Sequence, residues 1–227
     1  MFGSESDMTD IVVRWMQAQD LTVRAEFISP WGVCDLVGLS FNERKVAHRL
    51  RLGQRMPITT ICRAAVLLRI PDIETGDSIS VTELAELWNN VIPLQTIMLE
   101  AQRLMNDGFL VSHYGRLQKK NGWMPLHRRL VAVELKLTRV EEAIQQAENN
   151  LGFTNESYLA LPLDLAVRTW NRGSRKAELR QKGLGLLGVT KFKCEELLRP
   201  KIRCAATFPI VQFQCVEKFW RERPKVS

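Results

Sequence analysis

The chain has 227 residues, 45% of them hydrophobic and 25% charged, with a net charge of +7 and an isoelectric point near 9.4. Such a chain can bury a real core as one large domain or two small ones. The excess of basic residues favours a polyanionic partner. Nucleic acid is the first candidate and a membrane surface the second. No apolar run approaches the roughly 18–20 residues that span a bilayer, so we expect no membrane segment.

The cysteine pattern and the first ten residues indicate in which cellular compartment the protein is expected. The five cysteines are odd in number and include no C-x-x-C pair, which predicts reduced thiols in a cytoplasmic protein and no structural zinc site. The first ten residues carry three acids and no basic-then-apolar pattern, so we expect no secretory signal.

The first forty residues predict a helix and a β-hairpin. Apolar residues recur at helical spacing over 8–19, and residues 21–28 and 33–41 alternate as two strands. On the second strand, Asp35 shares a face with apolar neighbours, while Glu26 on the first has no assigned role. Because burying a lone carboxylate is costly, we expect Asp35 to have a raised pKa, a charge partner or a bound cation, unless it lies at a frayed strand end.

The middle of the chain predicts mostly helices. Residues 43–55 are basic and suit a linker or a solvated helix, and residues 58–70 suit a short apolar helix. Ser80 and Glu83 have the spacing of a capping box, which opens another helix running to about residue 89.

A further helix and two strands follow. Pro93 suits the first turn of the helix and Gly108 its end. Residues 109–114 and 123–126 predict short strands, joined by a basic loop at 115–122 that ends in an Asn-Gly turn.

In length and order of elements, residues 57–126 resemble a winged-helix domain. The resemblance implies that the helix after Pro93 enters the major groove of DNA while the basic loop contacts phosphates. Glu100 on that helix argues against DNA, and the alternative is a module that contacts protein or only packs. The expected DNA contacts are Gln95, Thr96, Gln102 and Arg103 on the helix and Arg116, Lys119 and Lys120 on the loop.

The last hundred residues alternate strands and helices, which predicts an α/β core with a partly parallel sheet. Over 131–137, period-two alternation places Ala132, Glu134 and Lys136 on one face and Val131, Val133, Leu135 and Leu137 on the other. Further strands are expected at 157–161 and 184–190, and helices at 138–151, 163–170 and 211–221. Residues 172–182 are strongly basic, and from them we expect phosphate contacts by Arg172, Arg175, Lys176 and Arg180.

An isolated Glu-x-Lys pair is most simply an ion pair on a solvated sheet face. Together with Asp35, a helix carrying Gln146 and the strand Tyr158-Leu159-Ala160-Leu161-Pro162, however, Glu134-x-Lys136 resembles the PD-(D/E)XK nuclease superfamily. The resemblance covers residues 8–41 and 128 to about 190. It implies an α/β fold with a restriction-endonuclease-like mixed sheet flanked by helices. We therefore expect a nuclease core at 1–43 and 128–227, with a mostly α, winged-helix domain inserted at 44–127.

The resemblance also implies roles. A Mg²⁺ or Mn²⁺ ion would be held by Asp35, Glu134 and the carbonyl of Leu135. Lys136 would orient the attacking water and stabilise charge on the phosphate, and Gln146, or Gln145 in a shifted register, would support the site. The family often has an acid on the first helix, where Asp10 is the best placed residue and Asp7 lies at the edge.

The expected function is thus a metal-dependent DNA endonuclease. One metal site cuts one strand, so cutting both strands would require a homodimer or two visits. The competing interpretation is a non-catalytic DNA-binding or regulatory protein in which Glu134 and Lys136 form an ion pair. A third interpretation is a nuclease that acts on RNA or on branched DNA.

Overall fold

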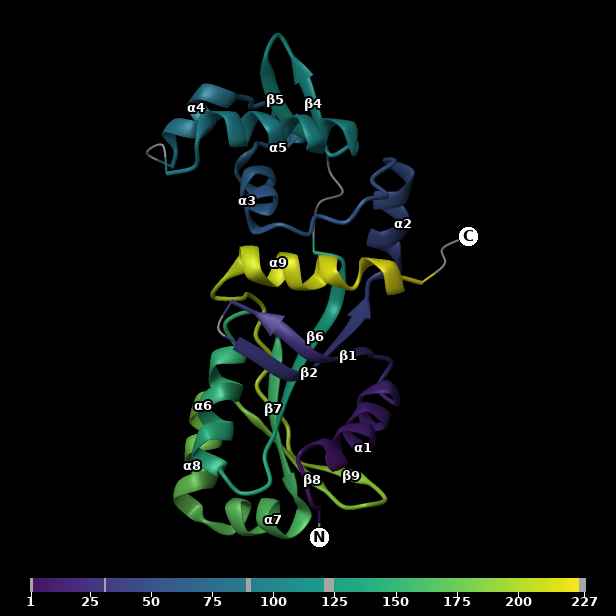
Figure 1. Ribbon diagram of the computed structural model, residues 1–227, viewed down its shortest axis with the longest axis vertical. Helices are drawn as coiled ribbons and strands as arrows, with labels where there is room; N and C mark the ends of the chain where they lie inside the picture. The colour runs from purple at the N-terminus through teal and green to yellow at the C-terminus, as the bar shows by residue number, and fades with distance from the viewer. Residues whose placement is uncertain (1, 31, 89–90, 121–124, 225–227) are drawn as a thin grey trace. The chain divides into compact units, whose positions relative to one another are not determined.

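The computed structural model describes residues 2–30, 32–88, 91–120 and 125–224 (Figure 1). Its contacts divide the chain into unit 1, Met1–Ser40 with His127–Gln212, and unit 2, Phe41–Leu126 with Phe213–Ser227. The sequence predicts that the C-terminal residues belong to the core, whereas the segment from Phe213 belongs to unit 2. A long-range ion pair explains this difference, because the Glu217 carboxylate accepts hydrogen bonds from Arg49 and from the backbone of Ile58.

Unit 1 is built on a mixed sheet of six strands in the order β1-β2-β6-β7-β8-β9. The β1–β2 hairpin is antiparallel, β6, β7 and β8 are parallel, and β9, which the sequence does not predict, is antiparallel to β8. The predicted α/β class with a mixed sheet flanked by helices is therefore confirmed. The strands are β1 (Thr22–Ser29), β2 (Gly32–Phe41), β6 (His127–Leu135), β7 (Glu156–Pro162), β8 (Gly185–Val189) and β9 (Cys194–Leu198).

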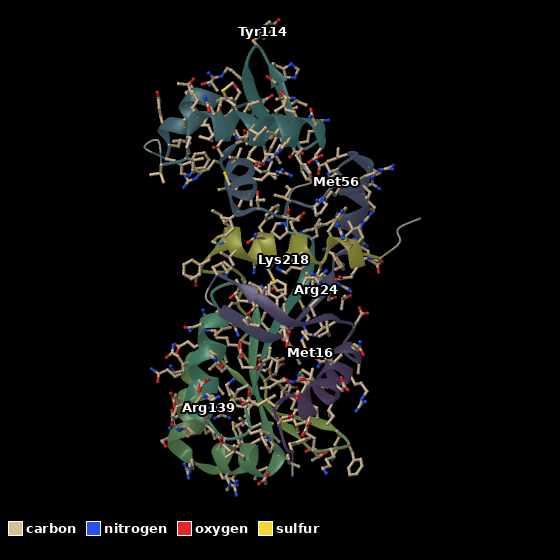
Figure 2. The ribbon with its side chains drawn as sticks, viewed as in Figure 1. Met16, Arg24, Met56, Tyr114, Arg139 and Lys218 are labelled. Carbon is tan, nitrogen blue, oxygen red and sulfur yellow. The ribbon has the colours of Figure 1, made fainter. Side chains whose placement is uncertain are left out.

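Helices cover both faces of this sheet (Figure 1). Helix α1 (Ser6–Gln17) packs on the face that contains Val133 and Leu135, and Met16 points into this core (Figure 2). The other face is covered by α6 (Val140–Asn150), α7 (Leu163–Asn171) and α8 (Gly173–Lys182). The predicted alternation along β6 is thus confirmed for Val131, Val133 and Leu135, which face α1, whereas the opposite face, with Ala132 and Glu134, is also buried.

Unit 2 contains helices and a second, three-stranded sheet in the order β3-β5-β4. The chain passes through α3, β3, α4, α5, β4 and β5 in turn, and both α3 and α4 pack on α5. The elements are α2 (Glu43–Arg51), α3 (Ile61–Arg69), β3 (Ile79–Ser80), α4 (Val81–Glu86), α5 (Leu94–Asn106), β4 (Leu110–His113) and β5 (Arg116–Lys119). Helix α9 (Pro209–Lys218) begins in unit 1 and belongs to unit 2 from Phe213.

The hairpin of unit 2 differs from the prediction. The sequence predicts a basic loop at 115–122, whereas the chain turns at Tyr114 and Gly115 and returns as β5. Both turn residues have positive φ, 51° and 75°, as a two-residue hairpin turn requires (Figure 2). Residues 125–126 are not in a strand, and the predicted Asn121-Gly122 turn lies outside the described residues.

The capping box that opens α4 is confirmed. The Ser80 hydroxyl accepts a 3.2 Å hydrogen bond from the Glu83 amide, and the Glu83 carboxylate accepts one of 2.8 Å from the Ser80 amide. We expect Ser80→Ala to lower the free energy of unfolding of unit 2 by about 1 kcal/mol, because a helix-terminal amide loses its partner. Urea unfolding measures this change. The neighbouring Thr82→Ala leaves the cap intact, and an equal loss there would contradict the explanation.

Candidate active site

Asp35 and Glu134 come together because β2 and β6 are neighbours in the unit 1 sheet. The Asp35 carboxylate accepts a 2.7 Å hydrogen bond from the backbone N–H of Leu135, so this side chain links the two strands. The charge of the Asp35 carboxyl group also acts on the Glu134 carboxyl group and raises its pKa. The structure therefore brings together the two carboxylates that the sequence predicts as metal ligands, with the backbone of Leu135 beside them.

Glu134 is only 2% exposed. Burial raises its pKa to about 7, and the nearby charge of Asp35 acts in the same direction. The side-chain amide of Asn150 on α6 opposes this by donating a 2.6 Å hydrogen bond to the Glu134 carboxylate. A carboxylate as buried as that of Glu134, with a second carboxylate beside it, ionises readily when a cation compensates its charge.

Two neighbours of Glu134 are absent from the sequence-based prediction. The Asn150 amide that contacts Glu134 also donates to the Cys34 sulfur at 3.4 Å, and the Cys34 thiol in turn donates to the carbonyl of Leu36 at 3.3 Å. Burial and the two nearby carboxylates raise the pKa of this thiol, so it stays protonated. Asn150 follows Gln146 by four residues and so lies one turn further along the same helix face. This spacing is the feature of the sequence that could have predicted Asn150 as a second site residue on the helix.

Gln146 lies on α6, while the alternative residue Gln145 is exposed and donates to Asn149. The side-chain oxygen of Gln146 is buried, and within the described part of the chain it has no hydrogen-bond partner. Because α6 runs back along β6, Gln146 is one turn closer than Asn150 to the end of β6 that carries Lys136. This position suits a supporting role better than that of Gln145.

Lys136 directly follows β6 and is 6% exposed. Its ammonium lies 3.5 Å from the carboxylate of Glu5, just before α1, and Glu5 also accepts a 3.4 Å hydrogen bond from the backbone of Leu137. Among the described residues, no ion pair joins Lys136 to Glu134. The simplest interpretation of the Glu-x-Lys pattern was an ion pair between Glu134 and Lys136 on a solvated sheet face. That interpretation therefore does not describe this site.

A cavity of about 420 Å³ opens beside Asp35 and the backbone of Leu135. Its wall includes Glu5 and Asp10 from the start of α1 and Glu26 from β1. Glu26 lies opposite Asp35 in the hairpin register, between the pairs Ala25–Leu36 and Phe27–Cys34. Sequence reasoning assigned no role to Glu5 or Glu26, because the contacts that bring them to the cavity are distant along the chain.

Within the described ranges, no three Asp, Glu, His or Cys side chains form a group that could hold a metal ion. The site offers two carboxylates, those of Asp35 and Glu134, and the Leu135 carbonyl. Mg²⁺ prefers hard oxygen ligands and keeps several waters, so two carboxylates and a carbonyl can suffice. The donor set and the raised pKa of Glu134 thus fit a divalent cation that is held largely by water.

The basic stretch 172–182 forms α8, and its cations have different environments. Arg175 pairs with Glu141 and with Glu178. The Lys176 ammonium and the Arg180 guanidinium lie 4.1 and 5.4 Å from the ring centre of Trp170. Arg172 is exposed. Arg172, Lys176 and Arg180 are therefore better placed for phosphate contacts than Arg175.

The predicted phosphate contacts of the unit 2 hairpin are largely occupied within the protein. Lys119 is 5% exposed and lies 3.7 Å from Asp72, and its burial lowers its pKa. Arg116 pairs with Glu83 and donates to the carbonyl of Ser78. Lys120 is half-buried. Lys119 does not suit a surface contact, because β5 turns alternate side chains inward.

Helix α5 exposes Gln95, Gln102 and Arg103, while Thr96 is half-buried. Glu100, which argued against DNA, points inward and accepts hydrogen bonds from Arg63 at 2.6 Å and from Arg103 at 2.8 Å. The acid is therefore neutralised inside unit 2, although Arg103 is partly engaged as a result.

No family model, curated protein or solved structure matches the chain. Over the described ranges, no helix combines the length and the apolarity that crossing a membrane requires. Function has to be inferred from the geometry around Asp35 and Glu134.

Proposed function

We propose that the protein is a metal-dependent endonuclease of the PD-(D/E)XK type, which hydrolyses phosphodiester bonds in DNA. The observation that carries the proposal is the pairing of buried Glu134 with Asp35 on neighbouring strands, beside a cavity and with Lys136 two residues further on. A carboxylate pair of this kind is unfavourable in a bare protein, and a divalent cation would make it favourable.

The chain's own groups suit this chemistry. Asp35, Glu134 and the Leu135 carbonyl would hold Mg²⁺ or Mn²⁺, which when bound supplies a Lewis acid and lowers the pKa of water. Lys136 places a buried ammonium where charge develops on the phosphate, and Glu5 holds that ammonium in position. A water oxygen attacks phosphorus, a phosphorus–oxygen bond of the backbone breaks, and the leaving oxygen takes up a proton.

The arrangement of unit 1 supports a restriction-endonuclease-like core. The order of elements agrees with the resemblance: helix α1, the β1–β2 hairpin, strand β6, helix α6 and strand β7. The candidate metal ligands come from β2 and β6, which are neighbours in the sheet. Unit 2 departs from the chain between those two strands, which agrees with an insertion.

We propose further that unit 2 contains a winged-helix module that presents DNA to the core. Its support is the order α3-β3-α4-α5-β4-β5 and the pairing of β3 with the last strand of the hairpin. Gln95, Gln102 and Arg103 on α5 would face the groove. The Tyr114 side chain projects from the tip of the hairpin, where it can reach the DNA backbone (Figure 2).

The test is incubation of supercoiled plasmid and of a labelled single strand with Mg²⁺, Mn²⁺ or EDTA. We expect nicked plasmid or shortened strands with either metal and intact substrate with EDTA. DNA binding without cleavage under every metal would contradict the proposal and would favour a non-catalytic DNA-binding protein. Direct conversion of plasmid to linear DNA would indicate that two copies act together.

Asn150 is expected to act as a positioning residue. Its amide lowers the pKa of Glu134, so Asn150→Ala should raise that pKa further and move the acid limb of the cleavage–pH profile to higher pH. Near neutral pH we expect cleavage to slow by about tenfold. The exposed Gln145→Ala on the same helix is the control. A loss of rate without a shift in the pH profile would indicate only a structural role.

A further inference from the structure

The hairpin between β8 and β9 ends in an exposed aromatic residue between two lysines, Lys191-Phe192-Lys193. Phe192 is 90% exposed. Leaving such a ring in water forgoes the free energy that its burial would contribute. The stretch is basic and protrudes, which is the pattern of a contact residue and not of a packing residue.

The turn that presents Phe192 is held by hydrogen bonds. The Thr190 amide donates to the Lys193 carbonyl at 2.9 Å. The Thr190 hydroxyl accepts from the amides of Phe192 and Lys193 at 3.3 and 3.1 Å. The aromatic ring therefore projects from a defined turn, so little conformational entropy would be lost when it contacts a ligand.

The tip lies at the same end of unit 1 as the candidate active site. Strands β6 and β8 are both parallel to β7, so the residues after them, Lys136 and Thr190, lie at one edge of the sheet. Hydrogen bonds from Ser4 and Gly3 lower the pKa of Asp7 on α1, and the charge of Lys191 adds to this effect.

The same part of α1 forms the wall of the cavity. Thr9 and Asp10, one turn beyond Asp7, line it together with Asp35. Figure 1 shows the β8–β9 hairpin beside the N-terminal part of α1, and α1 packs on both strands. A nucleic acid strand that reaches Asp35 past the start of α1 would therefore pass close to this hairpin.

We propose that Phe192 stacks on a nucleobase of the substrate while Lys191 and Lys193 contact the flanking phosphates. This inference rests on the proposed nuclease function and names its substrate class: DNA with unstacked bases near the cut, either single-stranded or locally opened. A base inside an intact duplex offers no free face, so the ring must meet a base that is already unstacked or must wedge a step open. Lys193 pairs with half-buried Glu195, and a phosphate can replace that partner.

Stacking predicts a specific change in binding. With EDTA present to prevent cleavage, Phe192→Ala should weaken binding of a short labelled single strand roughly 5- to 150-fold, while binding of a blunt duplex changes little. Phe192→Trp should retain the affinity. Ile202→Ala is the matched control, because Ile202 is also apolar, 65% exposed and in unit 1. A strand containing 2-aminopurine should lose fluorescence on binding the wild type and much less on binding Phe192→Ala.

Three results would overturn the proposal. If Phe192→Ala binds and quenches the single strand like the wild type while plasmid cleavage persists, the nuclease function stands and stacking is excluded. If the wild type neither binds nor cleaves DNA, the nuclease function fails and stacking fails with it. If Phe192→Ala loses only its co-sedimentation with vesicles of phosphatidylcholine and phosphatidylserine, the tip contacts membranes, since an aromatic ring between lysines also suits a lipid surface.

Discussion

Lys136→Ala should reduce the rate of metal-dependent DNA cleavage by about 10²–10³-fold and leave DNA affinity nearly unchanged. The ammonium is buried and pairs with Glu5, a residue of the cavity wall, and no ion pair among the described residues joins it to Glu134, so it is available to the phosphate once substrate displaces water. An interaction made mainly in the transition state affects the chemical step more than binding. Single-turnover cleavage measures the rate, and fluorescence anisotropy with EDTA measures affinity.

The chain contains a matched control for this substitution. Lys119 in unit 2 is buried to a similar degree, and its ammonium lies 3.7 Å from the carboxylate of Asp72. Lys119→Ala should therefore cause a comparable structural disturbance and leave the chemical step unaffected. Equal losses of cleavage in the two variants would mean that Lys136 matters for folding alone, and the catalytic role would have to be abandoned.

Glu134→Gln should abolish cleavage and at the same time stabilise the metal-free protein at alkaline pH. The folded-state pKa of Glu134 is about 7, above its ordinary value of 4.5. Between these two values the folded state holds a proton that the unfolded state has released, so the free energy of unfolding falls as pH rises. The full loss, reached above about pH 7, is about 3 kcal/mol, and glutamine avoids it.

Calorimetry at pH 5 and pH 8 with EDTA tests this expectation. The melting temperature of the wild type should fall between the two values by several degrees more than that of Glu134→Gln. At pH 8, Mn²⁺ should restore the wild type and have little effect on the variant, because the cation compensates a charge that glutamine lacks. Glu156→Gln is the contrasting control: this buried carboxylate pairs with Arg129 at 2.8 Å, so its removal should destabilise. Parallel pH dependence in the wild type and Glu134→Gln would contradict the raised pKa.

Local pattern determined much of the fold. The alternation of apolar residues in β6 placed Val133 and Leu135 on the core side, because strand side chains alternate and one face must be buried. The Ser80–Glu83 spacing identified the start of α4, because a capping box involves only residues within one helical turn. The same local signals predicted a helix, a hairpin and then strand–helix–strand, and hence the α/β class.

Local sequence patterns gave wrong predictions where the structure of a segment depends on contacts with residues distant along the chain. The basic run that contains Arg116 and Lys119 has the composition of a loop, yet it pairs with β3 and β4 because two neighbouring strands offer it hydrogen bonds. Residues 213–227 follow the core in sequence, yet the Arg49–Glu217 pair joins them to unit 2. Neither outcome depends on short-range spacing.

The candidate site divides in the same way. The sequence predicts Asp35, Glu134 and Lys136 as site residues through the resemblance to PD-(D/E)XK nucleases, which depends on residue types on successive predicted elements. Only the tertiary structure decided that Lys136 pairs with Glu5 and that Asn150 holds Glu134. The physical reason is that a carboxylate's partner and its pKa depend on which side chains surround it after folding, and these come from α1, β2 and α6, far apart along the chain.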